Sequence, residues 1–318
     1  MNITITGNLG SGKSSICKML KERGYEIIST GTIFRELAIE HNMSVEDFNR
    51  KVHEDTRKGD HSVDALIDQR TTRMNAEKDN VVFDSRLAWN FAPGSFKVFV
   101  IVDINEAARR VYHDSLRKES ESYESQEECR AGLRNRQDIE NKRFKEIYNI
   151  DYFDMGNYNL VIESTNTTTE ALVEEILLRF EEFKEGVFEN LVELNPVSVY
   201  PTKKLAECMD GGAGKDGGAG KDGGAGKNGS AGKDSRQQVA MSSGTFYAQE
   251  DHTLLVETLR EGKEFLSVRV VDFAEQEALT AVDYEEFEAA FGFYYRSYPQ
   301  KEEMKDSNLL IFPKIHSL

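Results

Sequence analysis

The sequence predicts an α/β protein in which a parallel sheet carries helices on both faces, followed by a smaller α+β part. Three observations predict this class. Short apolar runs alternate with longer amphipathic stretches, a glycine-rich segment joins the first run to the first amphipathic stretch, and the composition changes abruptly at residue 210. Alternation of strand and helix is typical of parallel sheets, because the crossover helices cover both faces.

The predicted strands are short and rich in Ile, Val and Phe, as expected for strands that are buried on both faces. They comprise residues 3–6, 25–29, 80–84, 96–103 and 158–164. The amphipathic stretches predict helices at 12–23, 31–41, 44–58, 62–78, 105–116, 125–148 and 168–183. The last helix follows Asn-Thr-Thr-Thr-Glu at 166–170, which is typical of a helix N-terminus.

The composition allows a sizeable core and argues against a nucleic-acid partner. Of the 318 residues, 39% are hydrophobic and 30% are charged, and the net charge of -16 is divided evenly between residues 1–183 and 184–318. Binding to a nucleic-acid backbone needs clustered Lys and Arg, and neither part is basic. We therefore expect no nucleic-acid partner.

Cysteine usage and hydropathy indicate a cytoplasmic protein. Cys17, Cys129 and Cys208 are scattered and show no CxxC spacing, so we expect buried or free thiols rather than a disulfide framework or a zinc site. No apolar run reaches 18 residues, and the N-terminus leads directly into a strand. We expect a cytoplasmic location and no membrane partner.

The segment GNLGSGKSS, residues 7–15, fits the pattern G-x-x-x-x-G-K-[ST] between a strand and a helix. Glycines allow successive backbone N–H groups to turn toward phosphate oxygens, and the following helix adds its N-terminal dipole. The lysine reaches the β and γ phosphates, and the serine hydroxyl after it ligates Mg²⁺. We predict a nucleoside triphosphate site whose phosphate-binding residues are Gly7, Gly10, Ser11, Gly12, Lys13, Ser14 and Ser15.

Two arginines follow the second and third predicted strands. Arg35 lies in STGTIFRELA, residues 29–38, and Arg86 lies in VVFDSRLAW, residues 81–89. Ligands of parallel α/β sheets bind outside the carboxyl ends of the strands, so both side chains are expected near the triphosphate site. A planar guanidinium suits a phosphate, and we predict that these two arginines bind a phosphate on the acceptor.

A third group of polar residues lies on the predicted helix 125–148. Arg136, Glu140 and Arg143 are spaced i, i+4 and i+7, which places them on one face of the helix. An acidic side chain between two arginines could read a base edge while the arginines hold phosphate. Taken alone, the spacing is more typical of a solvated helix with ion pairs.

Together these residues resemble the cytidylate kinase family, particularly its short form, over residues 1–183. The resemblance rests on four elements in order, namely the phosphate loop, Thr30-Gly31-Thr32-Ile33-Phe34-Arg35, Asp84-Ser85-Arg86, and Arg136 to Phe144 followed by YNID at 148–151. It implies a P-loop nucleoside-kinase-like fold with five parallel strands. It also implies an enzyme that phosphorylates CMP or dCMP with ATP and Mg²⁺.

The resemblance assigns roles to residues by their position in the motifs. Gly10 to Ser15 would hold the ATP phosphates, and Ser14 would ligate Mg²⁺. The acceptor nucleotide would be bound by Thr30, Gly31, Arg35, Asp84, Arg86, Arg136, Glu140 and Arg143, with Glu140 helping to read cytosine. A lid at about residues 110–130 would supply an arginine to the transferred phosphoryl group. Arg109, Arg110 and Arg117 are the candidates, and Arg109 and Arg117 join Lys13 as predicted catalytic residues.

Four departures from the family pattern bear on substrate choice and rate rather than on ATP binding. Ser85 stands where the family commonly has glycine, and Gln137 replaces an acid. Glu140 is one methylene longer than the commoner Asp, although the short form has precedent for it. The lid sequence SLRKESESYESQEE, residues 115–128, is acidic, rich in serine and poor in arginine.

Residues 184–318 predict a small α+β domain without an assigned role, interrupted by a disordered repeat at 210–235. Four units of the GGAGKD type fill residues 211–234, and glycine-rich chain without apolar residues cannot bury a core. The flanking segments 190–202 and 245–273 faintly resemble ParB/sulfiredoxin-like domains, but the glycine and arginine of their G-x-H-R turn are absent beside His252. We expect His252 to start a helix rather than to act in catalysis. This domain is also where a protein partner would bind.

Two alternatives stay open at this point. The chain could be another small-molecule P-loop kinase. However, a buried Glu140 would have no function toward an acceptor whose base lacks a hydrogen-bond donor. It could also be a nucleotide-binding sensor or assembly module with a degenerate kinase domain. The acidic lid favours the second alternative, whereas the intact phosphate loop and the two acceptor arginines oppose it.

Overall fold

A computed structural model describes most of the chain, and its described residues form two compact units. The described residues are 1–114, 123–202, 205, 208, 236–242, 245–249, 252–271 and 289–291. The first unit comprises residues 1–191 and the second begins at Val192. The repeat at 210–235 and the candidate Arg117 lie outside the described residues.

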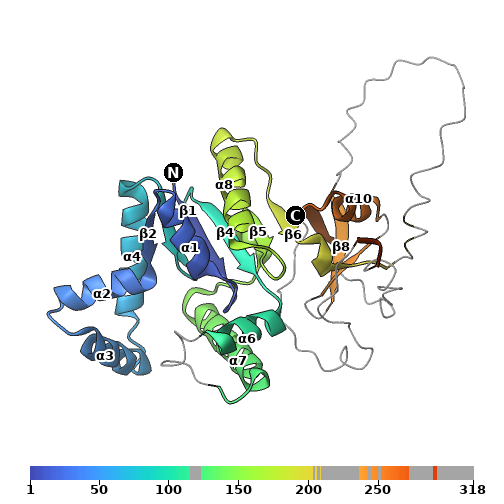
Figure 1. The fold of residues 1–318 in the computed structure, drawn as a ribbon. Helices are drawn as coiled ribbons and strands as arrows, with labels where there is room; N and C mark the ends of the chain where they lie inside the picture. Colours follow the sequence, from blue (N-terminus) through green and yellow to red (C-terminus); the bar gives the residue numbers. More distant parts are fainter. Residues whose placement is uncertain are drawn as a thin grey trace, which may run out of the picture. The chain divides into compact units, whose positions relative to one another are not determined.

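The first unit contains the predicted parallel sheet (Figure 1). Its strands are β1 Ile3–Gly7, β2 Glu26–Ser29, β3 Val81–Asp84, β4 Phe96–Ile101 and β5 Leu160–Glu163, in the order β2-β3-β1-β4-β5. All four neighbouring pairs are parallel, with Ile5 opposite Asp84 and Gly7 opposite Val100. The carboxyl ends of β1, β3 and β4 therefore lie at one edge, where ligands of such sheets bind.

Apart from α5, which was not predicted, the helices of this unit follow the predicted ranges closely. They are α1 Lys13–Glu22, α2 Thr30–Glu40, α3 Val45–Arg57, α4 Ser62–Glu77, α5 Ala88–Phe91, α6 Ile104–His113, α7 Gln126–Tyr148 and α8 Thr169–Glu185. Side-chain oxygens of Ser29, Ser44, Asp103, Ser125 and Thr168 accept hydrogen bonds from the first backbone N–H groups of α2, α3, α6, α7 and α8. These residue types are preferred at helix N-caps, which explains why the helix starts were predictable.

Aromatic side chains pack on both faces of the sheet, as two side chains of β4 show. Phe96 contacts Phe180 and Phe183 of α8, with ring centroids 5.8 and 5.2 Å apart. Phe99, three residues on, contacts Phe153 and Tyr158 at 6.1 and 4.8 Å. Since successive side chains of a strand point to opposite faces, these two aromatic groups lie on opposite sides of the sheet.

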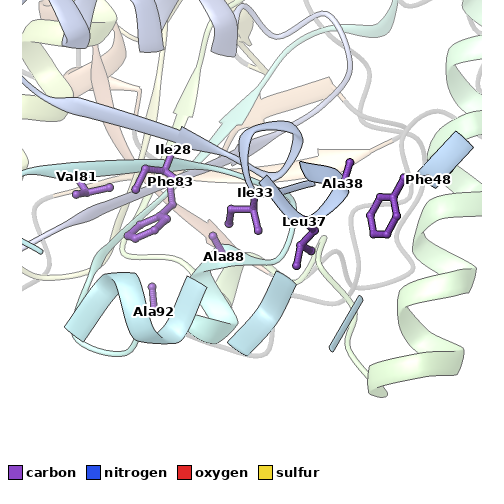
Figure 2. Packing of buried hydrophobic residues seen from close by; sticks show 9 residues of the cluster. All are labelled: Ile28, Ile33, Leu37, Ala38, Phe48, Val81, Phe83, Ala88 and Ala92. Carbon is purple, nitrogen blue, oxygen red and sulfur yellow. The ribbon is translucent and has the colours of Figure 1, made fainter. Parts of the chain in front are cut away.

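Helices α2 and α3 are held to the sheet edge by an apolar cluster (Figure 2). Phe48 of α3 is 1% exposed and lies beside Leu37 and Ala38 of α2. The cluster continues to the sheet and α5 through Ile28, Ile33, Val81, Phe83, Ala88 and Ala92. This packing fixes the start of α2, which carries Thr30, Gly31 and Arg35, relative to the end of β3.

The second unit contains strands from both sides of the repeat. They are β6 Leu191–Leu194, β7 Val199–Tyr200, β8 Gln237–Ser242, β9 Thr245–Ala248 and β10 Leu266–Val271, with the helix α10 Thr253–Glu261 and the short 3-10 helix η2 Pro196–Ser198. Their order is β6-β10-β8-β9-β7. The parallel pair β7–β9 and the antiparallel pair β6–β10 each join a strand before the repeat to one after it. Segments flanking the repeat thus form one sheet.

Four of the described elements were not predicted from the sequence. These are α5, the short 3-10 helix η1 Met155–Asn157, β8 and η2. The first two are only four and three residues long, and β8 reads QQVAMS, without the apolar run that identified the other strands. In the part of the chain that the structure describes, no helix combines the length and apolarity needed to cross a membrane.

Candidate functional site

The phosphate loop needs glycine at two positions for steric and backbone reasons. Gly10 has a φ of +76°, and a Cβ there would lie 2.9 Å from the carbonyl oxygen of Ala107 in α6. Gly12, with a φ of +85°, is the N-cap of α1. Residues with a side chain rarely adopt this left-handed backbone. The loop therefore curls tightly against α6 and delivers free backbone N–H groups at the start of α1, which suits phosphate.

Lys13, the first residue of α1, folds back over the loop. Its ammonium donates a hydrogen bond to the carbonyl oxygen of Gly7 at 3.3 Å. Burial, aided by the Arg86 guanidinium, lowers the pKa of Lys13 to about 8, while the carboxylates of Asp84 and Glu140 act in the opposite direction. The phosphate loop and the residues that follow β3 are therefore close enough to share one electrostatic environment.

An open pocket of about 280 Å³ lies over the loop. It is lined by Gly10, Ser11, Gly12, Lys13, Ser14, Ser15, Arg110, Val111 and Asp114. The Ser11 hydroxyl is buried and has no hydrogen-bond partner among the described residues. A buried polar group without a partner is costly, and a phosphate oxygen would satisfy it. The glycines, the lysine and this hydroxyl all fit a nucleoside triphosphate.

Of the lid arginines, Arg110 lines the pocket. Its guanidinium donates to the carbonyl oxygen of Ser164 at 2.7 Å and of Gly10 at 3.4 Å, and its Nε donates to Glu106 at 2.8 Å. Arg109 also pairs with Glu106, at 2.7 Å, and its side chain is 54% exposed. Arg109 does not line the pocket in this structure, so Arg110 is the member of the pair that the geometry brings to the phosphate loop.

The residues after β3 meet helix α7 in a charged cluster. Arg86 forms an ion pair with Glu140, and Arg136 lies 3.5 Å from the other oxygen of the same carboxylate. The carbonyl oxygen of Ser85 accepts a hydrogen bond from the Thr6 hydroxyl of β1 at 2.9 Å. Both partners of the Arg86–Glu140 pair are about one quarter exposed, so the cluster is accessible from solvent and shielded in part.

Tyr152 was not predicted as a site residue, and it lies directly behind this cluster. It is 1% exposed, and its phenol interacts electrostatically with Arg86 and Glu140. Burial raises the pKa of the Tyr152 phenol, so the group stays neutral and donates or accepts as a hydroxyl. The YNID stretch at 148–151 leads to this residue, which is the sequence signal that could have indicated it.

Arg143 does not join the cluster with Glu140 but forms an ion pair with the neighbouring helix α4. Its guanidinium donates to Asp64 of α4 at 2.6 Å, and the Tyr148 hydroxyl donates to Asp68 of α4 at 2.8 Å. Burial raises the pKa of Asp68 to about 6. The structure thus brings Arg136 and Glu140 together but directs Arg143 to α4. Spacing on one helix could not indicate this, because the partners are on another element.

Arg35 lies on the exposed side of α2. Its guanidinium donates to the hydroxyl of Thr32 at 3.3 Å, and it also lies beside Gly31, where a Cβ would be 3.5 Å from it. Thr30 and Gly31 begin α2 directly after β2, whose carboxyl end lies beside that of β3. Arg35 and Arg86 therefore follow neighbouring strands, as expected, but Arg35 does not line the pocket over the phosphate loop.

Comparison with known proteins identifies the family. Residues 2–166 match the family model described as the cytidylate kinase-like family. A cytidylate kinase from Methanocella arvoryzae is 31% identical over 187 residues, covering 58% of this chain and all of that protein. A cytidylate kinase from Methanothermobacter thermautotrophicus is 32% identical over 172 residues, covering 54% of this chain and 99% of that protein.

Among solved structures, a shikimate kinase from Bacteroides thetaiotaomicron is 16% identical, with a TM-score of 0.38, over 58% of this chain and 98% of that one. Similarity of this size says nothing about the substrate. The family model, by contrast, spans the phosphate loop, the arginine after β3 and the charged face of α7. The chain therefore belongs to the cytidylate kinase-like family of P-loop nucleoside monophosphate kinases.

Proposed function

We propose that this protein transfers the γ-phosphoryl group of ATP to CMP or dCMP, with Mg²⁺. One observation carries the choice of acceptor. Glu140 is a partly buried carboxylate held between Arg86 and Arg136, and it interacts electrostatically with Lys13 of the phosphate loop. A base-reading acid and two phosphate-binding cations thus lie beside the triphosphate site.

A carboxylate at this position favours cytosine over uracil. An ionised carboxylate only accepts hydrogen bonds, and the exocyclic amino group of cytosine donates them. Uracil carries a carbonyl oxygen there, which would face Glu140 without a proton between them. Leaving such a buried pair unsatisfied costs more than an ordinary hydrogen bond gains, so the acid discriminates.

The donor would be held by the loop 10–15 and by Arg110. Backbone N–H groups of the loop, the Ser11 hydroxyl and the Lys13 ammonium would bind the phosphate oxygens. Arg110 lines the same pocket and is held by Ser164, so its position is set before the nucleotide enters. Mg²⁺ bound with ATP would neutralise phosphate charge, and the Ser14 hydroxyl is the side chain that would hold it.

The acceptor phosphate would be held by arginines that the structure places after β2 and β3. Arg86 interacts electrostatically with the buried Tyr152, and Arg35 is exposed on α2 and able to turn toward a ligand. With both nucleotides aligned in this way, little covalent chemistry is left to the protein, because positioning and charge neutralisation lower most of the barrier.

The proposal is tested by measuring ADP formation with ATP, Mg²⁺ and each of CMP, dCMP, UMP, AMP and GMP. We expect turnover with CMP or dCMP, and a fall of roughly 10²–10³-fold in Lys13→Ala with the fold retained. Turnover confined to another acceptor would make the protein a different small-molecule kinase. Tight ATP binding without turnover on any acceptor would leave only nucleotide binding, and near-normal turnover of Lys13→Ala would contradict the assigned site.

A further inference from the structure

A buried hydrogen bond joins the phosphate loop to the helix that carries the base-reading acid. The side-chain amide of Asn8 donates to the side-chain oxygen of Gln137 at 3.2 Å, across 129 residues of sequence. Asn8 is 3% exposed and Gln137 is 6% exposed. Asn8 directly follows Gly7, so this bond starts from inside the phosphate loop.

Gln137 is a polar residue on the buried side of α7. The buried residues of α7 are Cys129, Leu133 and Gln137, spaced i, i+4 and i+8 along one side of the helix. Cys129 and Leu133 are almost fully buried against their surroundings. Burying a polar amide in such a stripe is unfavourable unless it is hydrogen-bonded, so its bond with Asn8 accounts for its presence there.

The backbone of Asn8 is itself fixed on both sides. Its N–H donates to the carbonyl oxygen of Val100 in β4 at 3.1 Å, and its carbonyl oxygen accepts from the N–H of Ser11 at 3.3 Å. The Asn8 side chain is therefore held rigidly by the sheet and the loop. Its hydrogen bond to Gln137 fixes Gln137 relative to the donor site.

Because Gln137 is part of α7, fixing Gln137 also fixes the acceptor-site residues on the same helix. It is adjacent to Arg136 and three residues from Glu140, both of which belong to the charged cluster with Arg86. A slip of α7 by a single residue would move these groups by about 1.5 Å along the helix axis. Misplacement of reacting groups by about 1 Å can lower a rate roughly 10²-fold, so this spacing matters for transfer.

We propose that Gln137, through Asn8, is a positioning residue that sets the distance between the donor phosphates and the acceptor nucleotide. The inference rests on the proposed function of the same site. Gln137 would contact neither nucleotide. Substitution of Gln137 should therefore lower the rate of phosphoryl transfer to the acceptor nucleotide. ATP binding and the hydrolysis of ATP by water should persist.

The first experiment compares wild type, Gln137→Leu and the control Asn135→Ala, which removes an exposed amide from the same helix. CDP formation from CMP and ADP formation without CMP are measured separately. For Gln137→Leu we expect CDP formation to fall about tenfold, with ATP hydrolysis, the KM for ATP and the number of ATP sites little changed. A purely structural defect would lower transfer and hydrolysis in proportion, and that result would overturn the positioning role.

The second experiment tests the hydrogen bond without any assay of activity. Thermal unfolding is measured for Asn8→Leu, Gln137→Leu and the double variant. Because each single change leaves the other amide without its partner, the double variant should lose less stability than the two single losses added together. Additive losses would overturn the inference whatever the chain phosphorylates. If the stability losses are non-additive but wild type makes no CDP or dCDP, the hydrogen bond is confirmed. In that case the proposed function and the positioning role are both wrong.

Discussion

Lys13 shows how burial adjusts a residue to its task. An ammonium with a pKa near 8 is only weakly favoured in the empty site, because it is removed from water and faces Arg86. A bound triphosphate supplies the missing negative charge and would return the lysine to its charged form. The free energy of binding then includes the recovery of this charge.

The lowered pKa of Lys13 predicts a pH dependence of ATP binding. Above pH 8 the empty protein loses the ammonium proton, and ATP has to bind together with a proton. We expect the dissociation constant of ATP to rise about tenfold between pH 7 and pH 9 in calorimetric titrations. Lys13→Arg keeps its charge over this range and serves as the control. Equal pH dependence in both proteins would contradict a lysine origin.

The contribution of Lys13 to the folding stability of the empty protein should increase with pH, whereas ATP binding weakens with pH. Since the folded pKa is below the unfolded value, the unfolded chain binds more protons between about pH 8 and 10.5. The contribution of this group to stability therefore rises with pH in that window.

Asp68 predicts a second pH effect, of the sign expected for a buried carboxyl. Its folded pKa of about 6 lies above the ordinary value of 3.8, so the unfolded chain releases the proton first and stability falls as pH rises from about 4 to 6. Asp68→Asn keeps an acceptor for the Tyr148 hydroxyl and removes the charge. The free energy of unfolding is measured with denaturant at pH 4.5 and pH 7. Relative to wild type, the variant should be about 1 kcal/mol more stable at pH 7 than at pH 4.5, after allowance for solvent screening of a half-exposed group. No change in that difference would contradict the raised pKa.

The site could be predicted from the sequence where one local motif holds the chemistry. The glycines, Lys13 and the arginine after β3 follow from motif spacing and strand order alone. The partners of Arg143, Arg110 and Asn8 could not be predicted, because Asp64, Ser164 and Gln137 come from elements distant in sequence. Such pairings depend on how helices are rotated against each other, which hydrophobic periodicity does not resolve.

At the scale of elements, the phosphate loop depends on its close contact with α6. Gly10→Ala should destabilise the protein by about 1–3 kcal/mol and weaken ATP binding, because the new methyl group would meet the Ala107 backbone. Gly24→Ala is a matched control, with a φ of +95° and no heavy atom within 4 Å of the added Cβ. It carries the backbone strain without the contact. Equal losses of stability in the two variants would show that the contact with α6 contributes nothing.

Elements were predictable where packing and capping agreed with local sequence. Strands β3, β4 and β5 of the first unit are buried and mostly apolar, and five of its helices begin at Ser, Thr or Asp caps. Strand β8 was missed because its sequence is polar at both ends and its pairing with β9 and β10 decides its conformation. Helix α5 is a single turn, which is too short for a periodicity to appear.

At the scale of the whole molecule, the division into a kinase domain at 1–183 and a C-terminal domain at 184–318 remains a prediction. All described residues of the proposed site lie in the first unit, and the relative from Methanocella arvoryzae is matched over its whole length by 187 residues. The second unit contains His252, which precedes α10 and accepts a hydrogen bond from the backbone N–H of Thr202 at 2.9 Å. This contact gives His252 a structural role.

A fragment of residues 1–191 should therefore fold and act alone. We expect one cooperative unfolding transition and a kcat on CMP within about twofold of the full chain, since domains with their own core fold independently. Size-exclusion chromatography and the coupled ADP assay check this. An aggregated or inactive fragment would show that residues after 191 complete the kinase domain.

We propose that Glu140 makes this P-loop kinase selective for cytosine over uracil. The decisive experiment measures the ratio of kcat/KM for CMP to that for UMP, in wild type and in Glu140→Gln. We expect a strong preference for CMP in wild type, and a ratio lowered by roughly 10²-fold or more in the variant, whose amide can also donate to uracil. An unchanged ratio, or no turnover of CMP by wild type, would contradict it.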